Sequence, residues 1–264
     1  MTITTVDGII AGAKPPVYFH KALSGNLLAG RPHTPIYTAG IPGAAVANAS
    51  GLSGAALTSY AGQLSFTNPG SGNTHLTRLA ATGTQNGTLM LVDRLWHSGD
   101  VGFASGVKTI NSVAWPARDA DGTTAGKGVM VGLEISTATG AGTPVPVLTY
   151  TNNAGTSGQT ASPAFAYGAS SIQGSFYPFA LAAGDVGVQS IQSLNFPSTM
   201  TSGVIHLVAY RVLAMIDIGA SGGAAGPLEL GLPRMFDNTV PQLIFVPSAT
   251  TSTFLAGTMS VTQG

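Results

Sequence analysis

Cysteine is absent from the 264-residue sequence, which excludes disulfide bonds, thiolate metal sites and a cysteine nucleophile. Charged residues make up only 8% of the chain, about a third of their usual share. Ten Lys and Arg balance ten Asp and Glu, so no basic excess favours nucleic-acid binding. A free chain with so few charges tends to self-associate, so we expect much of its surface to be buried in an assembly. A surface of Ser, Thr, Asn and Gln is the alternative interpretation.

Targeting and membrane signals are also missing. The first residues, Met1–Asp7, contain no basic segment and no long apolar run, so they do not form a secretory signal. The longest apolar stretch, 204–218, is interrupted by His206, Arg211 and Asp217 and cannot span a bilayer. We therefore expect no membrane partner, and a protein that stays in the cytoplasm where it is made or is released by lysis.

Helix-forming windows are rare because the chain contains 36 Gly and 16 Pro. Hydrophobic residues nevertheless reach 44%, enough for a real core, and β-branched and aromatic residues cluster in runs bounded by Gly, Asn and Pro. This pattern predicts an all-β fold, an antiparallel β-sandwich of jelly-roll type. The predicted strands are 88–97, 107–115, 128–137, 145–152, 162–165, 172–181, 187–194, 204–215, 242–246 and 253–261.

Residues 1–80 differ from the rest of the chain. They contain turn signals and short extended pieces, with small residues dominating 44–61. Such a segment cannot easily bury a core alone, so we predict an extended N-terminal arm at 1–80 and a β-sandwich domain at 81–264. The arm would be ordered by lying on the domain or on a neighbouring subunit.

Two groups of residues resemble metal sites only superficially. The five histidines do not have the spacing of metal ligands, and no carboxylate completes a ligand set. Asp119 and Asp121 resemble the start of a calcium loop, but no acidic residue follows until Glu134. We interpret 119–122 as a turn in which the aspartates accept hydrogen bonds from backbone amides. The histidines are His20, His33, His75, His97 and His206.

Two glycine-rich segments resemble catalytic motifs. Gly219–Gly223 matches G-x-S-x-G with Ser221 in the nucleophile position, but the sequence after it predicts a loop where that motif needs a helix. Gly122–Gly128 resembles a phosphate-binding loop, but Lys127 is followed by Gly rather than Ser or Thr. We therefore predict no catalytic, cofactor or metal residue and no enzyme activity.

A hydrolase acting on bacterial polysaccharide stays open as an alternative, because two carboxylates of the β region could meet in a groove about 5–10 Å apart. The two tryptophans, Trp96 and Trp115, are expected in the core or an interface rather than on a sugar-binding surface. The available carboxylates are Asp93, Asp100, Glu134, Asp185, Asp217, Glu229 and Asp237.

Four segments follow one another in the middle of the chain: Leu91-Val-Asp-Arg-Leu-Trp-His97, Ile110-Asn-Ser-Val-Ala-Trp-Pro-Ala-Arg-Asp119, Gly128-Val-Met-Val-Gly-Leu-Glu-Ile-Ser-Thr137 and Leu148-Thr-Tyr-Thr-Asn-Asn-Ala-Gly155. In this order they are similar to a family of tailed-bacteriophage virion structural proteins. Two earlier segments, Ala39–Gly43 and Gly51–Gly62, are similar to the same proteins, so the resemblance covers most of residues 30–160.

The resemblance implies a particle protein, and most closely a capsid decoration (cement) protein that forms a homotrimer on the phage major capsid protein. Such a protein would be assembled in the bacterial cytoplasm and located on the capsid surface. A tail or tail-fibre component that binds host-surface glycan is the second alternative, with solvent-facing aromatics and a shallow pocket near 98–106 or 153–162. Candidate partner contacts are the aromatic residues of the arm: Tyr18, Phe19, Tyr37, Tyr60 and Phe66.

Overall fold

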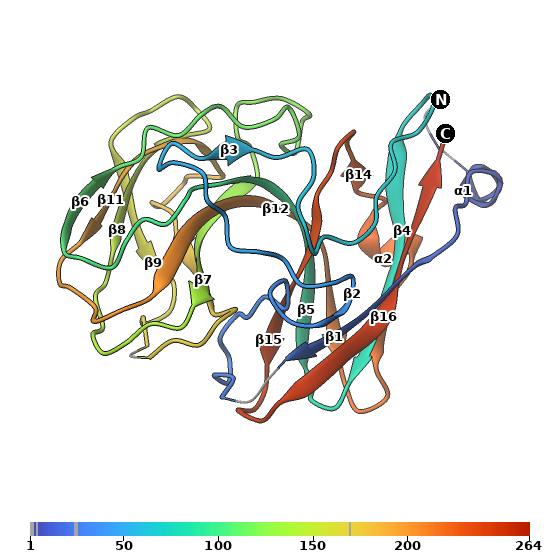
Figure 1. Ribbon diagram of the computed structural model, residues 1–264. Helices are drawn as coiled ribbons and strands as arrows, with labels where there is room; N and C mark the ends of the chain where they lie inside the picture. Colours follow the sequence, from blue (N-terminus) through green and yellow to red (C-terminus); the bar gives the residue numbers. More distant parts are fainter. Residues whose placement is uncertain (1–2, 4, 24–25, 169) are drawn as a thin grey trace. The chain divides into compact units, whose positions relative to one another are not determined.

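The computed structural model describes residues 3, 5–23, 26–168 and 170–264 and is shown in Figure 1. The chain divides into two compact units. The chain passes from one unit to the other after residue 93, inside β5 (Gly87–His97), and again after residue 211, inside β12 (Val204–Ile218). Each of these long strands therefore contributes to both units. Unit 1 consists of 1–45, 58–93 and 212–264, and unit 2 consists of 46–57 and 94–211.

Unit 1 contains an antiparallel sheet in the order β13-β4-β16-β1-β2, and β14 also pairs with β4. Its central strands, β4, β16 and β1, are long and lie side by side in Figure 1. A further strand, β15, pairs with residues 87–93 of β5. The bounds are β1 Val17–Leu23, β2 Gly40–Ile41, β4 Thr74–Gly83, β13 Gly223–Ala225, β14 Arg234–Met235, β15 Pro241–Pro247 and β16 Thr253–Gln263.

Strand β1 shows how the sheet of unit 1 has one buried face and one open face. Alternate residues Phe19, Lys21 and Leu23 are buried, whereas Tyr18 and His20 between them are exposed. The buried lysine interrupts the apolar alternation that would otherwise identify the strand. On the buried face, Phe19 lies against Gly257 of β16, where an added methyl would overlap its ring and the carbonyl of Ala80.

Unit 2 contains a longer antiparallel path of strands. Residues 204–211 of β12 pair with β7, and the pairing continues in the order β7-β10-β9-β8-β11-β6. The short strand β3 pairs with the end of β5 through Ala55 and Ala56. The bounds are β3 Ala55–Ala56, β6 Gly106–Thr109, β7 Val129–Thr137, β8 Val147–Asn152, β9 Gln159–Pro163, β10 Phe176–Ala180 and β11 Val188–Phe196.

The described part of the chain contains two short helices. α1 (Val6–Ala11) begins at the N-cap Thr5, whose side chain accepts a hydrogen bond from Gly8 N. α2 (Pro227–Leu230) lies between β13 and β14 and ends at Gly231, whose φ of 67° is the left-handed cap that glycine favours. Neither helix has a buried residue, and neither is long and apolar enough to cross a membrane.

The prediction of an all-β antiparallel fold is confirmed, while the jelly-roll topology stays a prediction. The structure divides the chain differently from the predicted arm of 1–80 and domain of 81–264. β1 lies inside the sheet of unit 1, between β16 and β2, and β4 forms another of its long strands. Residues 1–45 and 58–80 therefore belong to a compact unit, because their strands supply two of the three long strands of its sheet.

Candidate functional site

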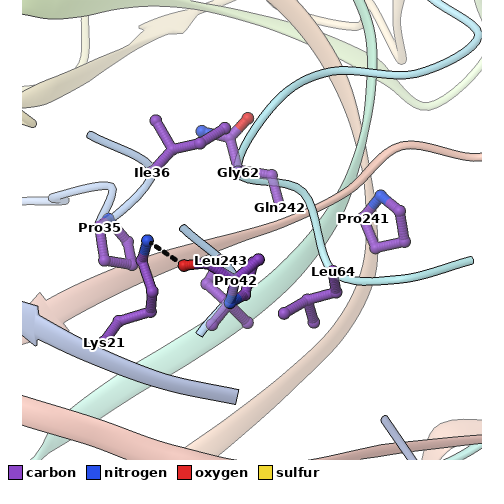
Figure 2. Close-up of a pocket in the computed structure, with 9 residues that line it drawn as sticks. All are labelled: Lys21, Pro35, Ile36, Pro42, Gly62, Leu64, Pro241, Gln242 and Leu243. Carbon is purple, nitrogen blue, oxygen red and sulfur yellow. Dashed lines mark hydrogen bonds between the residues drawn. The ribbon is translucent and has the colours of Figure 1, made fainter. Parts of the chain in front are cut away.

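Lys21 lies in an enclosed pocket of unit 1 and is its only charged lining residue (Figure 2). Its ammonium group donates hydrogen bonds to the carbonyls of Thr38 and Pro42, at 2.7 and 2.9 Å, and a longer one of 3.5 Å reaches Gly43 O. Burial lowers the pKa of Lys21 from 10.5 to about 8. The pocket is lined by Lys21, Pro35, Ile36, Pro42, Gly62, Leu64, Pro241, Gln242 and Leu243.

A lysine with a lowered pKa can serve as a nucleophile or a base when a substrate reaches it. Here the free volume is about 10 Å³, room for no more than a water molecule. The three donors of the ammonium group are directed at the three carbonyls of 38–43. The geometry therefore assigns Lys21 a structural role, which is to hold the 38–43 segment, including β2, against β1.

A second polar cluster lies in the interior of unit 2 and is built from residues of β5, β7 and β12. Arg94 and Glu134 form an ion pair with both side chains fully buried and an N–O distance of 2.8 Å. Arg94 also donates to Nδ1 of His97 at 3.0 Å, so this ring nitrogen is an acceptor and the imidazole is neutral. Burial lowers the pKa of His97 to about 2, and the charge of Arg94 contributes.

His206 extends this cluster across the neighbouring strand, because it is the cross-strand partner of Glu134. Its Nδ1 lies 3.2 Å from Ser98 O and its Nε2 lies 2.8 Å from Ser136 Oγ. Burial lowers the pKa of His206, although the carboxylate of Glu134 acts in the opposite direction. A neutral imidazole that donates to Ser98 O and accepts from Ser136 satisfies both ring nitrogens.

Trp96 and Trp115 are buried together, as expected from the sequence. Their ring centroids are 5.3 Å apart, and each indole N–H donates to a backbone carbonyl, Ser53 O and Val188 O respectively. Arg118, from the same segment as Trp115, is also buried, and its guanidinium group donates to Leu57 O at 2.8 Å. These side chains fasten the segments of unit 2 to one another and leave no aromatic platform of tryptophan for a sugar.

The turn interpretation of 119–122 is confirmed for Asp119, whereas the Asp121 carboxylate accepts from the exposed Lys127 ammonium group at 3.1 Å rather than from a backbone amide. The Asp119 carboxylate is buried and accepts hydrogen bonds from the amides of Asp121, Thr123, Gly126 and Lys127. Burial alone would raise the pKa of Asp119, but these hydrogen bonds lower it overall. The donors are all N–H or O–H groups, so the carboxylate organises the 119–128 loop and its oxygens are already engaged.

Ser221 lies exposed on a tight turn between β12 and β13, where Gly222 N donates to Gly219 O. The sequence predicted a loop after this turn, and that was wrong in detail. Strand β13 follows immediately, and then the four-residue helix α2. The helix is too short and comes too late to form the strand–turn–helix of a nucleophile elbow.

The carboxylates considered for a polysaccharide hydrolase are, apart from Asp237, each engaged in hydrogen bonds that build the fold. Asp93 accepts from Val240 N, Asp100 from Gly102 N and Ile205 N, Asp217 from Thr88, and Glu229 from Gly226 N. Asp185 accepts from the Tyr150 hydroxyl at 2.6 Å and from Asn152 at 2.7 Å. Among the described residues, no three His, Asp or Glu side chains gather as metal ligands.

The five aromatic residues predicted as partner contacts lie in different environments. Phe19 and Tyr37 are buried within their own chain, at 0% and 7% exposure. Tyr60 and Phe66 are half-buried, and Tyr18 is 51% exposed on the open face of β1. The structure therefore does not bring the five together, and Tyr18 is the most exposed of them.

Sequence reasoning missed two open hollows on unit 1. One has a volume of about 420 Å³ and is lined by apolar residues of β1 and β16, by Phe66 and by Lys14. The other, of about 430 Å³, lies over the open face of the sheet, where β13, β4 and β16 present small residues such as Ala80, Ala224 and Ala256. Both are formed by strands that the sequence pattern did not identify or placed only in part.

No protein-family model and no curated protein matches the sequence. Among solved structures, a chain described as "Structure of infectious bursal disease virus Gt strain" is similar over 96% of this chain and 81% of its own length, at 11% identity and a TM-score of 0.20. A chain of the Gx strain of the same virus gives 10% identity and a TM-score of 0.19, over 94% and 78% of the two chains. Scores this low carry no argument about fold or function.

Proposed function

We propose that this chain is a virion structural protein of a tailed bacteriophage, and within that class a capsid decoration protein that stabilises the head by contacts between subunits. The observation that carries the proposal is the use of the polar residues in the four phage-like segments. Arg94, Glu134, Arg118 and Asp119 are buried in ion pairs or hydrogen bonds that join strands and loops. Polar side chains that are buried and paired in this way stabilise the fold, and they are not available to bind a substrate.

The distribution of charge supports the same proposal. Seven of the 20 charged residues are buried, which leaves the other 13 charged side chains at the surface of this 264-residue chain. Aliphatic side chains take their place at several exposed positions, among them Val46 at 76%, Val107 at 66% and Leu228 at 95%. A surface of this kind is suited to burial against other subunits.

The glycan-binding and hydrolase alternatives have less support. Both tryptophans are in the core of unit 2, and the carboxylates are engaged as described above. Phe103, at 37% exposure, is the aromatic residue in 98–106 that a tail-fibre component would present. A glycan array probed with the purified protein distinguishes this alternative, which predicts saturable binding that is lost in Phe103→Ala.

Co-sedimentation with capsids tests the proposal. The purified protein is mixed with undecorated capsids of its own phage, and its mass alone is measured by sedimentation equilibrium. We expect a closed oligomer, a trimer by resemblance, that pellets with capsids in a fixed ratio to the major capsid protein. Failure to bind capsids at any concentration would contradict the decoration function and direct attention to the tail.

A further inference from the structure

Helix α1 is too short to be stable without packing, yet none of its side chains is buried in the described part of the chain. It has six residues, and isolated helices of this length are marginal in water. Val6 and Ile10 are 70% and 68% exposed, and their i, i+4 spacing places them on one side of the helix. The helix therefore presents an exposed apolar side formed by Val6 and Ile10.

The C-terminal end of α1 is held to β16, so the helix cannot turn back onto its own unit. Gln263 N donates to Gly12 O at 2.9 Å, and Thr262 Oγ1 donates to Ile9 O at 2.9 Å. Ala13 forms a β-bridge with Thr262. An added methyl on Gly12 would overlap the carbonyl of Gln263, which shows how closely the two segments approach.

The hollow lined by β1, β16 and Phe66 begins at Lys14, directly after the residues that hold α1 to β16, and we call it the groove. It has a volume of about 420 Å³, and its floor contains Val17, Phe66, Met259 and Val261. Lys14, which is exposed, supplies its positive charge. Because only Gly12 and Ala13 separate α1 from Lys14, and both are held to β16, the helix cannot enter the groove of its own chain.

We propose that α1 of one copy packs into this groove of a second copy. Val6 and Ile10 would cover the apolar floor, and Asp7 beside them would lie near Lys14, so that the apolar faces and the charges are both complementary. The proposal rests on the proposed function, since it names how subunits of the structural protein associate. The contact joins different surfaces of two copies, so it closes either as a reciprocal pair or as a ring.

Cross-linking between two single-cysteine variants tests the contact directly, because the natural chain contains no cysteine. Ile10→Cys protein, labelled with ¹⁵N, is mixed with unlabelled Thr67→Cys protein, whose substituted residue also lines the groove. After mild oxidation, we expect covalent dimers containing one labelled and one unlabelled chain. The matched control replaces Ile10→Cys with Val186→Cys, a residue exposed to 59%, and should give at least tenfold less of the mixed dimer.

Charge and apolar substitutions give an independent measurement in solution. Val6→Asp should raise the dissociation constant of the oligomer at least tenfold, whereas Val186→Asp should leave it unchanged. Asp7→Lys and Lys14→Glu should each weaken association, and the double variant should restore it in part. Thermal melts of each variant show whether it remains folded.

The outcomes separate this contact from the proposed function. Oligomers that form normally and join capsids without the specific cross-link would overturn the α1 contact and leave the decoration function standing. A monomer that joins capsids would overturn it in the same way. A specific cross-link in a protein that ignores capsids would support the contact while contradicting the decoration function.

Discussion

Replacing Glu134 by glutamine should destabilise unit 2 by about 3 to 5 kcal/mol, the usual effect of leaving one member of a buried ion pair without its partner. Arg94 and Glu134 are both fully buried with an N–O distance of 2.8 Å, so water cannot solvate the guanidinium charge that remains. The volume of the side chain is almost unchanged in Glu134→Gln, so the cost would come from the charge and not from a cavity.

Tryptophan fluorescence during urea unfolding measures this effect in unit 2 alone. The chain has two tryptophans, Trp96 and Trp115, and both lie within unit 2. Their rings are 5.3 Å apart in the core, so unfolding exposes both to water at once. The midpoint shift multiplied by the urea dependence gives the change in the free energy of unfolding.

The matched control is the double variant Arg94→Met with Glu134→Met, which removes both charges and retains apolar volume. It should cost less than Glu134→Gln alone, because no unpaired charge is buried, although Nδ1 of His97 loses its Arg94 donor. A loss below about 1 kcal/mol in Glu134→Gln, or a double variant less stable than the single one, would refute the argument that the pair matters through its charges.

Three further predictions concern single residues. As the pH rises from about 8 to 10.5, wild type should gain up to about 3 kcal/mol of stability relative to Lys21→Met. The reason is that the pKa of Lys21 is lowered in the folded state, so the unfolded chain holds the proton more tightly. Urea midpoints measured across this pH range give the gain, and a parallel pH dependence in both proteins would exclude this effect of Lys21. Asp119→Asn should lower the free energy of unfolding by at least about 2 kcal/mol at pH 7. This difference should shrink as the pH falls through the lowered pKa of Asp119, because the wild-type carboxylate then becomes neutral as well. Acid titrations of both proteins, followed by tryptophan fluorescence, measure the difference. Gly126→Ala should lower the free energy of unfolding by more than about 2 kcal/mol, because φ is +86° and an added methyl would overlap Val188 O. Gly155→Ala should lower it by only about 1 kcal/mol, because its φ of +82° is similar but no atom lies near the added methyl. Equal losses of stability in thermal melts would show that the close approach of Gly126 to Val188 is unimportant.

Long strands with β-branched and aromatic residues were predicted well from the sequence. The segments predicted at 88–97, 128–137 and 204–215 correspond to β5, β7 and β12, because both strand propensity and flanking turns favour them. The segment predicted at 107–115 ends earlier, at Thr109 in β6. Its remaining residues leave the strand so that Trp115 can enter the core.

The strands of the predicted arm were missed for physical reasons that concern particular residues. β1 has Lys21 on its buried face, and β4 ends in the consecutive small residues Ala80-Ala81-Thr82-Gly83, so neither shows the apolar alternation of a typical strand. The carbonyls that accept from Lys21 belong to 38–43, a segment around the two-residue strand β2 whose pairing with β1 is a tertiary property. The buried Arg94–Glu134 pair could not be predicted for the same reason, since 40 residues separate its members in the chain.

The order of the chain segments also has a consequence for synthesis on the ribosome. Strand β1 pairs along its whole length with β16, and the two lie at opposite ends of the chain. All residues of unit 2 have been made by residue 211, before 212–264 emerge, so unit 2 can fold while β1 still lacks its main partner. β1 must therefore remain without this partner strand, and open to aggregation or to chaperones, until residues 253–259 have been made.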